Sequence, residues 1–249
     1  MVNIAILGFG TVGSGVAEVL TRNGGLIDGR VNNQVRLKYI MRARDIFEGP
    51  YKDLFVKDFS IIERDPEVGI VVETIGGVGA ALDYTTRALK AGKSVVTANK
   101  ELVAAHGYEL LQLAKEHGVS YLFEASVGGG IPILRPLNAC LAANEVDQGT
   151  GILNGTTNYI LTRMIKAGLT FDQALKEAQA NGYAEQDPTA DVDGHDACRK
   201  TCILAALSFG QHIYPDQVPT QGIRGVSLAD VAYADSCGYK IKLLGRAIR

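Results

Sequence analysis

The sequence predicts an α/β protein: a doubly wound parallel sheet over residues 1–131, followed by an α+β domain over residues 132–249. Three observations predict this class. An apolar run at residues 2–7 leads directly into a glycine pattern that opens a helical stretch. Strand-like and helical stretches then alternate as far as residue 126. After SVGGGIP the pattern changes to mainly helical segments, which places the domain boundary near residues 128–136.

The first domain is predicted to consist of βαβ units. Apolar runs predict strands at residues 2–7, 35–42, 69–75, 94–98 and 120–126. Helical periodicity predicts helices at residues 11–21, 82–91 and 106–117. Gly92 and Gly118 directly follow two of these helices, at the position where a left-handed residue commonly ends a helix. Strands separated by helices of this length indicate a parallel sheet with helices on both faces.

The second domain is predicted to be mostly helical. Helices are expected at residues 132–143, 157–167, 171–180, 195–209 and from Ser227 onward. Thr170 and Gln173 form a capping-box pattern before the third of these. Strands are expected at residues 145–154 and in the closing stretch YKIKLLGRAIR. Either that closing strand pairs with an earlier strand or the sequence is cut short at its C-terminal end.

Composition is that of an ordinary soluble globular protein. The 249 residues are 47% hydrophobic and 21% charged, which is enough apolar material for a core. The net charge of -2 gives no electrostatic basis for binding nucleic acid or an anionic membrane. No apolar run approaches the roughly 20 residues that cross a bilayer, and the N-terminus does not resemble a signal peptide. We therefore expect a cytoplasmic protein.

The cysteines and histidines show no metal-ligand spacing, so no transition-metal site is expected. Cys198 and Cys202 are one helical turn apart and are interpreted as reduced, helix-packing thiols, and Cys140 and Cys237 also fall in apparent helices. None of these cysteines follows a predicted strand of the first domain.

The stretch GFGTVGSG predicts a dinucleotide site of the Rossmann type. The G-x-G-x-x-G pattern is weak alone, but here it follows a strand and opens a helix. Gly8 permits a tight turn, Gly10 lets the backbone approach a pyrophosphate, and Gly13 allows the helix to pack on the strand. A tight turn without a ligand is the alternative. The predicted cofactor-binding residues of this turn are Gly8, Phe9, Gly10, Thr11, Val12 and Gly13.

Three further strand ends should lie beside the cofactor, because ligands gather at the carboxyl ends of parallel strands. Arg42 and Arg44 precede Asp45 where a NAD-selective site would have an acid, so NADP is predicted over NAD. A solvated strand end is the alternative for both arginines. Thr74 lies in ETIGG after the next strand. Lys100, in TANKE, is predicted near the nicotinamide and the substrate, and the alternative is a surface lysine that starts a helix.

The helix from residue 195 carries a charged pair in line with its apolar stripe. Asp196 and Lys200 are four residues apart, and Ile203 and Leu207 continue the same face. The pair should therefore face the protein or a cleft. It is either a structural ion pair or a proton-transfer site in which Asp196 orients Lys200.

Three polar or glycine-rich stretches precede this helix in the sequence. GYAEQDPTAD offers Glu185 and Asp187 on a loop stiffened by Pro188, where a carboxylate could bind an ammonium or hydroxyl group. In LNGTTNYI, residues 156–158 are expected to cap a helix and line a polar pocket, or to cap it only. The three glycines of EASVGGGIP expose main-chain groups that could bind a small cation or form a hinge. The predicted substrate-binding residues are Glu185, Asp191 and Thr156.

Five motifs in order resemble homoserine dehydrogenase: GFGTVGSG, TANKELVA, EASVGGGIPI, GILNGTTNYIL and NGYAEQDPTADVDGHDACRK. The resemblance runs from residue 2 to residue 249, and its last two motifs are specific to the family. It implies NAD(P)-dependent interconversion of L-aspartate 4-semialdehyde and L-homoserine, on the route to threonine, methionine and isoleucine. It also implies a homodimer formed through the second-domain sheet, and a chain that continues past GRAIR.

The resemblance implies roles for individual residues. Lys200 matches the family's catalytic lysine, Asp196 the acid that supports it, and Lys100 the lysine between cofactor and substrate. Glu185 matches a substrate-binding carboxylate. A sodium-like monovalent cation would be bound by main-chain oxygens of Glu124, Val127, Gly129 and Ile131. Two other functions compete: an aldehyde-oxidising dehydrogenase that forms a thioester on cysteine, and a catalytically silent nucleotide-binding module.

Overall fold

The computed structural model describes residues 1–42 and 49–249. The chain divides into two compact units, Met1–Pro132 and Ile133–Arg249, one residue beyond the predicted boundary. Each unit has its own sheet and is described by itself.

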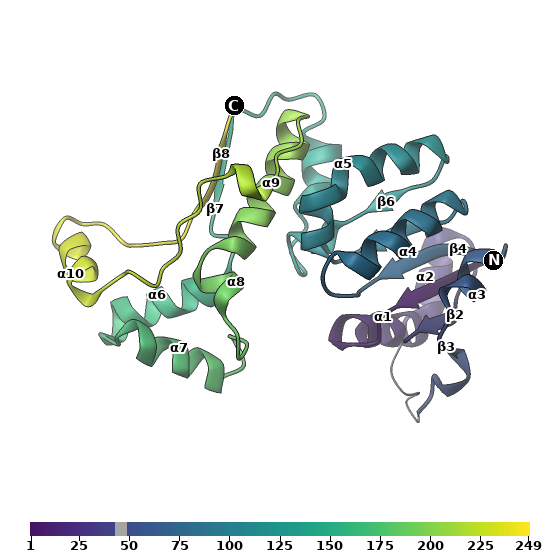
Figure 1. The fold of residues 1–249 in the computed structure, drawn as a ribbon, viewed down its shortest axis with the longest axis horizontal. Helices are drawn as coiled ribbons and strands as arrows, with labels where there is room; N and C mark the ends of the chain where they lie inside the picture. Colours follow the sequence, from purple (N-terminus) through teal and green to yellow (C-terminus); the bar gives the residue numbers. More distant parts are fainter. Residues whose placement is uncertain (43–48) are drawn as a thin grey trace. The chain divides into compact units, whose positions relative to one another are not determined.

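The first unit is built on a parallel sheet of six strands in the order β3-β2-β1-β4-β5-β6 (Figure 1). The strands are β1 Val2–Leu7, β2 Val35–Met41, β3 Phe55–Val56, β4 Val68–Glu73, β5 Ser94–Thr97 and β6 Tyr121–Leu122. The strand order reverses between β1 and β4, which is the switch point where open α/β sheets bind ligands. The predicted doubly wound parallel sheet is confirmed.

The helices of this unit cover both faces of the sheet (Figure 1). They are α1 Thr11–Arg22, α2 Gly24–Val31, α3 Phe59–Arg64, α4 Gly79–Lys90 and α5 Lys100–Glu116, with short 3-10 turns η1 Lys52–Leu54 and η2 Glu124–Ser126. Ile4 and Ile6 of β1 pack with Ala17 of α1 in the core, because a central parallel strand is buried on both faces. Gly92 and Gly118 have φ values of 71° and 65°, so both left-handed helix ends are confirmed.

Several boundaries differ from the prediction for local reasons. The strand β3 has only two residues, too few for an alternating pattern, and neither it nor α2 and α3 was predicted. Helix α5 begins at Lys100 instead of residue 106 because the Asn99 side chain accepts a hydrogen bond from the Leu102 N–H at 3.0 Å. The strand expected at residues 120–126 ends at Leu122, where the chain turns into η2.

The second unit combines helices with a two-stranded sheet. Its elements are the π-helix η3 Pro136–Cys140, β7 Gln148–Gly151, α6 Gly155–Ala167, α7 Phe171–Ala180, α8 Thr189–Val192, α9 His195–Phe209, the 3-10 turn η4 Pro215–Gln217, α10 Leu228–Ser236 and β8 Gly245–Ile248. Ile160, Leu161 and Met164 of α6 form its core with Ala174 and Ala178 of α7. The capping box of Thr170 and Gln173 is confirmed.

The helix predicted at residues 132–143 is present but shorter than expected and mostly of another type. It begins as an α-helix at residues 134–135 and continues over Pro136–Cys140 as a π-helix, in which the Leu141 N–H donates to the Pro136 carbonyl at 3.2 Å. Proline has no N–H, and its ring obstructs the preceding turn, so an α-helix cannot run smoothly through residue 136. The strand predicted at residues 145–154 is likewise shortened to β7.

The closing strand has its partner earlier in the chain, which was one of the two predicted alternatives. Strands β7 and β8 pair antiparallel, with Gln148 opposite Ile248 and Gly151 opposite Gly245. A Cβ atom on Gly245 would lie 2.2 Å from the Thr201 Oγ1, so α9 packs closely on this strand pair. None of the helices in the described residues combines the length and the apolarity that a membrane span requires.

Candidate active site

The glycine turn after β1 joins the carboxyl ends of three strands. The Gly8 N–H donates to the Met41 carbonyl of β2 at 3.0 Å, and the Thr74 N–H donates to the Leu7 carbonyl at 2.9 Å. Gly8 has a φ of +93°, and a Cβ on it would lie 2.9 Å from the Thr74 carbonyl oxygen. A Cβ on Gly13 would lie 2.1 Å from the Gly8 carbonyl oxygen. These two glycines are therefore required for the close approach of α1 to the turn.

The remaining face of this turn is open. A Cβ on Gly10 would meet no atom within 4 Å, and Thr11 and Val12 are exposed. Among the described residues, no side chain caps α1 at Gly10, and its first turn has no acidic residue. Uncapped N–H groups at a helix start attract anions, so the turn fits the pyrophosphate of a dinucleotide.

The other predicted cofactor-binding residues beside the turn make different contacts. The Phe9 ring packs edge-on against Phe55 at 5.1 Å and Tyr51 at 5.9 Å, which fixes its position beside the turn. Arg42 follows β2 and donates its N–H to the Val56 carbonyl at 3.1 Å. Arg44 lies outside the described residues. The Thr74 hydroxyl donates to the Leu7 and Gly8 carbonyls, at 2.9 and 3.1 Å.

A buried carboxylate organises the ends of β4 and β5. Glu73 is fully buried, and its carboxylate accepts hydrogen bonds from the Thr97 hydroxyl at 2.5 Å and the Ile75 N–H at 2.6 Å. Burial raises the pKa of this carboxyl group above its usual value. An acid at the end of the apolar run GIVVE was the signal for this role, which sequence reasoning missed.

The segment that carries Lys100 is held by Asn99. The Asn99 Nδ2 donates to the carbonyls of Ile75 at 3.0 Å and Gly77 at 2.6 Å, while its Oδ1 caps α5. Lys100 is the first residue of α5 and is half-buried. Lys100 therefore lies just after the carboxyl end of β5, as the position of TANKE in the sequence predicted.

The loop after β6 folds back on itself. The Glu124 carbonyl accepts N–H groups from Val127 at 3.3 Å and Gly128 at 3.4 Å. A Cβ on Gly128 would lie 2.1 Å from the Ile131 carbonyl oxygen. The main-chain oxygens of Glu124 and Ile131, two of the four predicted cation ligands, thus lie close to Gly128. Gly129 and Ile131 are exposed.

In the second unit, α9 turns its charged pair inward as predicted. The Lys200 Nζ lies 2.8 Å from the Asp196 Oδ2, and the two side chains are 16% and 3% exposed. The same Nζ donates to the Leu153 carbonyl at 2.9 Å. The lysine is therefore held in one position and retains limited access to solvent.

Asn154 connects this pair to Asp191, and sequence reasoning missed it. Its Nδ2 donates to the Asp191 Oδ1 at 2.7 Å and the Asp196 Oδ2 at 2.9 Å. Its Oδ1 caps α6 by accepting the Thr157 N–H at 2.8 Å. The prediction that residues 156–158 cap this helix is thus wrong, because the cap lies at the strand–helix junction. Asparagine before a Gly-Thr-Thr run was the available signal.

The other predicted substrate residues lie on neighbouring loops. The Thr156 hydroxyl donates to the Tyr183 carbonyl at 2.8 Å, and Glu185 is exposed. Asp187 accepts hydrogen bonds from Thr189, which hold the pKa of its carboxyl below the usual value. The described structure therefore brings together Asp191, Asp196 and Lys200, whereas Asp187 acts locally at the start of α8.

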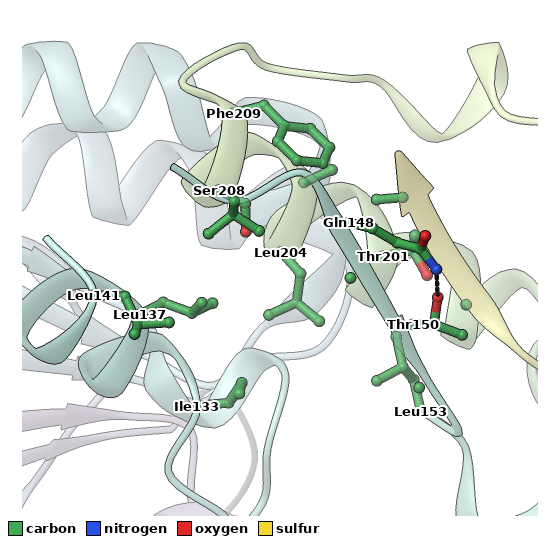
Figure 2. A pocket seen from close by; sticks show the side chains of 16 residues that line it. Ile133, Leu137, Leu141, Gln148, Thr150, Leu153, Thr201, Leu204, Ser208 and Phe209 are labelled. Carbon is green, nitrogen blue, oxygen red and sulfur yellow. Dashed lines mark hydrogen bonds between the residues drawn. The ribbon is translucent and has the colours of Figure 1, made fainter. Parts of the chain in front are cut away.

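The second unit also contains an apolar cavity of about 360 Å³ between η3, α9 and β7 (Figure 2). Leu137, Leu141, Leu204 and Phe209 are among the side chains that line it. None of the predicted catalytic or substrate-binding residues belongs to this lining. An apolar wall does not suit a small charged substrate, so we place the candidate site at the Asp191–Asp196–Lys200 cluster instead.

Cys202 of α9 does not suit nucleophilic catalysis. Cys202 is 2% exposed, and burial raises the pKa of its thiol to about 12. The thiolate is the reactive species, so such a thiol is inert near neutral pH. This argues against thioester chemistry on Cys202.

Comparisons with known proteins agree over the whole chain. The family model described as homoserine dehydrogenase matches residues 132–249, and that of the homoserine dehydrogenase NAD binding domain matches residues 8–124. A homoserine dehydrogenase of Synechocystis sp. is 45% identical over 249 residues, covering 99% of this chain and 57% of that protein. The chain thus spans less than two thirds of this relative's length.

Solved structures give the same result. A homoserine dehydrogenase from Thiobacillus denitrificans has a TM-score of 0.93 and 42% identity, covering 100% of this chain and 58% of that one. A putative homoserine dehydrogenase from Archaeoglobus fulgidus has a TM-score of 0.89 and 34% identity, covering 100% and 81%. A hyperthermophilic archaeal homoserine dehydrogenase solved with NADPH has a TM-score of 0.82 and 28% identity, covering 100% and 79%.

Proposed function

The chain belongs to the homoserine dehydrogenase family, and on that premise we propose that it interconverts L-homoserine and L-aspartate 4-semialdehyde with NADP(H). This reaction serves the biosynthesis of threonine, methionine and isoleucine. The observation that carries the proposal is the inward Asp196–Lys200 pair, 2.8 Å apart, beside a second carboxylate. An acid–base group fixed next to a binding carboxylate is what a proton-coupled reaction of an amino acid requires.

The nucleotide would be held by the Gly8–Gly13 turn, with Thr74 at the next strand end. NADP is favoured over NAD because Arg42 follows β2, where a guanidinium suits a 2′-phosphate. The open face of Gly10 and the uncapped start of α1 support this placement. When bound, the nicotinamide ring supplies or accepts the hydride.

Lys200 would move the proton. It donates to the substrate oxygen when the aldehyde is reduced and accepts the hydroxyl proton when homoserine is oxidised. Asp196 and the Leu153 carbonyl fix the ammonium group in position. Lys100, at the carboxyl end of β5, would supply a second positive charge for the developing alkoxide.

The substrate would be bound by carboxylates and a hydroxyl. Glu185 and Asp191 provide negative charge for the ammonium group, and Thr156 adds a polar contact. The exposed position of Glu185 and the half-buried position of Asp191 support a site that opens to solvent.

Three further features are part of the proposal. Main-chain oxygens of Glu124, Val127, Gly129 and Ile131 would bind a monovalent cation such as sodium, supported by the fold-back of that loop. The protein would form a homodimer through the β7–β8 sheet and act in the cytoplasm.

The test is homoserine oxidation by the purified protein with NADP and with NAD as cofactor. Lys200→Ala should lower kcat by roughly 10²–10⁴ while leaving nucleotide affinity unchanged. Lys176→Ala, on the exposed side of α7, is the matched lysine control and should retain full activity. Near-normal turnover by Lys200→Ala would reject the assigned role. Nucleotide binding without turnover in the unaltered protein would instead support a silent nucleotide-binding module.

The same assay measures cofactor choice. Arg42→Ala should lower the preference for NADP over NAD by weakening the contact with a 2′-phosphate, without changing kcat with NAD. An unchanged ratio of the two rates would remove Arg42 from the nucleotide site.

A further inference from the structure

The Asn154 amide lies between two carboxylates and reaches both. Its Nδ2 is 2.7 Å from the Asp191 Oδ1 and 2.9 Å from the Asp196 Oδ2, which is also the oxygen that Lys200 contacts. Asn154 is 4% exposed, so these bonds form away from bulk water. One neutral side chain thus joins the acid–base pair to the carboxylate proposed to bind substrate.

The other end of the amide is equally constrained. The Asn154 Oδ1 accepts both the N–H and the hydroxyl of Thr157, each at 2.8 Å. The reversed amide would aim its oxygen at two carboxylates and its NH₂ at a backbone N–H, so the hydrogen-bond network determines the orientation. Both donors and both acceptor positions of Asn154 are used.

We propose that Asn154 is a positioning residue, acting as a neutral double donor that fixes Asp191 relative to Asp196 and thereby sets Lys200 against the bound substrate. The inference rests on the proposed function. With both aspartates ionised and Lys200 protonated, the cluster has one net negative charge, which suits a substrate ammonium. The amide holds the two like charges together without contributing a charge or a proton of its own.

Three substitutions of Asn154 distinguish its role as a helix cap from its role as a double donor. Serine and aspartate cap helices as well as asparagine does, whereas alanine does not. Asn154→Ser and Asn154→Asp therefore keep the cap on α6 and remove the double donor, while Asn154→Ala removes both. If Asn154 were only a cap, the serine and aspartate variants would behave like the unaltered protein.

We expect Asn154→Ser to lower kcat/KM for homoserine by about tenfold to hundredfold, the usual effect of losing hydrogen bonds to charged groups. The nucleotide Kd should stay unchanged, and Tm should fall less than in Asn154→Ala, which loses the cap on α6 as well. Asn154→Asp should be less active than Asn154→Ser at pH 9, because three carboxylates then repel one another. Its activity relative to the unaltered protein should rise as the pH is lowered to 6, because a shared proton restores a donor.

Wild-type turnover by both cap-preserving variants would overturn the inference, as would a loss of Tm in them as large as in Asn154→Ala. A crystal structure of Asn154→Ser adds a measurement that does not depend on activity. We expect α6 to begin unchanged and the Asp191 carboxylate to turn away from Asp196. Unmoved carboxylates would overturn the inference even if the protein turned nothing over, and that lack of turnover would count against the proposed function alone.

Discussion

At Gly13 in the first unit, one added Cβ atom would lie 2.1 Å from a carbonyl oxygen, whereas at Asn154 in the second unit the side chain itself forms four hydrogen bonds. The glycine turn therefore depends on the absence of side-chain atoms, whereas the cluster around Asn154 depends on the hydrogen bonds that its side chains form. Backbone contacts of this kind tolerate almost no added volume. In a network of charged side chains, by contrast, different substitutions cause losses of different size, and the size of each loss depends on pH.

Gly13→Ala is the substitution with the largest expected effect and the strongest test of this difference. The clash with the Gly8 carbonyl should destabilise the first unit by about 2–3 kcal/mol and lower nucleotide affinity by roughly a hundredfold. Gly15→Ala, in the same helix, is the matched control, because a Cβ there would meet nothing within 4 Å beyond the helix's own backbone. That control should gain about 0.5–1 kcal/mol of stability. Chemical denaturation and nucleotide titration measure both effects, and equal behaviour of the two variants would contradict the steric account.

In the second unit, Asp196→Asn should act on turnover and not on nucleotide binding. The variant keeps the shape of the side chain but removes the charge that holds Lys200, so we expect kcat to fall roughly 30-fold, a fraction of a full general acid–base contribution. Steady-state kinetics with a parallel measurement of nucleotide Kd provide the test. Asp172→Asn, exposed at the start of α7, serves as the control. A rise in nucleotide Kd as large as the fall in kcat would show that the two sites are not separable in this way.

Thr74→Val measures how much one side chain contributes to the stability of the glycine turn after β1. Its hydroxyl donates to the Leu7 and Gly8 carbonyls, and a hydrogen bond of this kind contributes about 1 kcal/mol to stability, so Thr74→Val should lower the free energy of unfolding by about that amount. Thr85→Val is the counterpart, because its hydroxyl is buried without a hydrogen-bond partner among the described residues. We expect that variant to be neutral or more stable in thermal unfolding. A stability loss as large as that of Thr74→Val would mean that volume, not hydrogen bonding, determines both results.

The smallest effect is expected from Glu73, whose buried carboxyl brings pH dependence into the first unit. Burial raises its folded-state pKa above the ordinary value of 4.5, so the folded protein binds this proton more tightly than the unfolded chain does. Its contribution to stability is complete below that ordinary value and is lost as the pH rises through the folded pKa. The unaltered protein should therefore gain stability relative to Glu73→Gln as the pH is lowered from 8 to 5. Urea unfolding at several pH values tests this, and a constant difference would contradict it.

The sequence predicted most of the first unit, because long buried strands and glycine-ended helices leave strong local patterns. It did not predict β3, whose two residues are held by pairing with β2 instead of by any pattern of their own. The inward Asp196–Lys200 pair was predictable because helical spacing alone determines which residues share a face. Asn154 and Glu73 were not identified, because their roles depend on partners 42 and 24 positions away that only the fold brings near.

The pairing of β7 with β8 also has a kinetic consequence. Gln148 meets Ile248 a hundred positions later, whereas Val2 of β1 meets Val35 of β2. Closing the longer loop costs about 1 kcal/mol more in chain entropy. The parallel sheet can grow strand by strand during synthesis, but Gly245 cannot pack beneath Thr201 until residue 245 itself has been translated. The helix that carries Asp196 and Lys200 therefore completes its packing only with a strand that contributes neither residue, and the acid–base pair is fixed in place later than the glycine turn after β1.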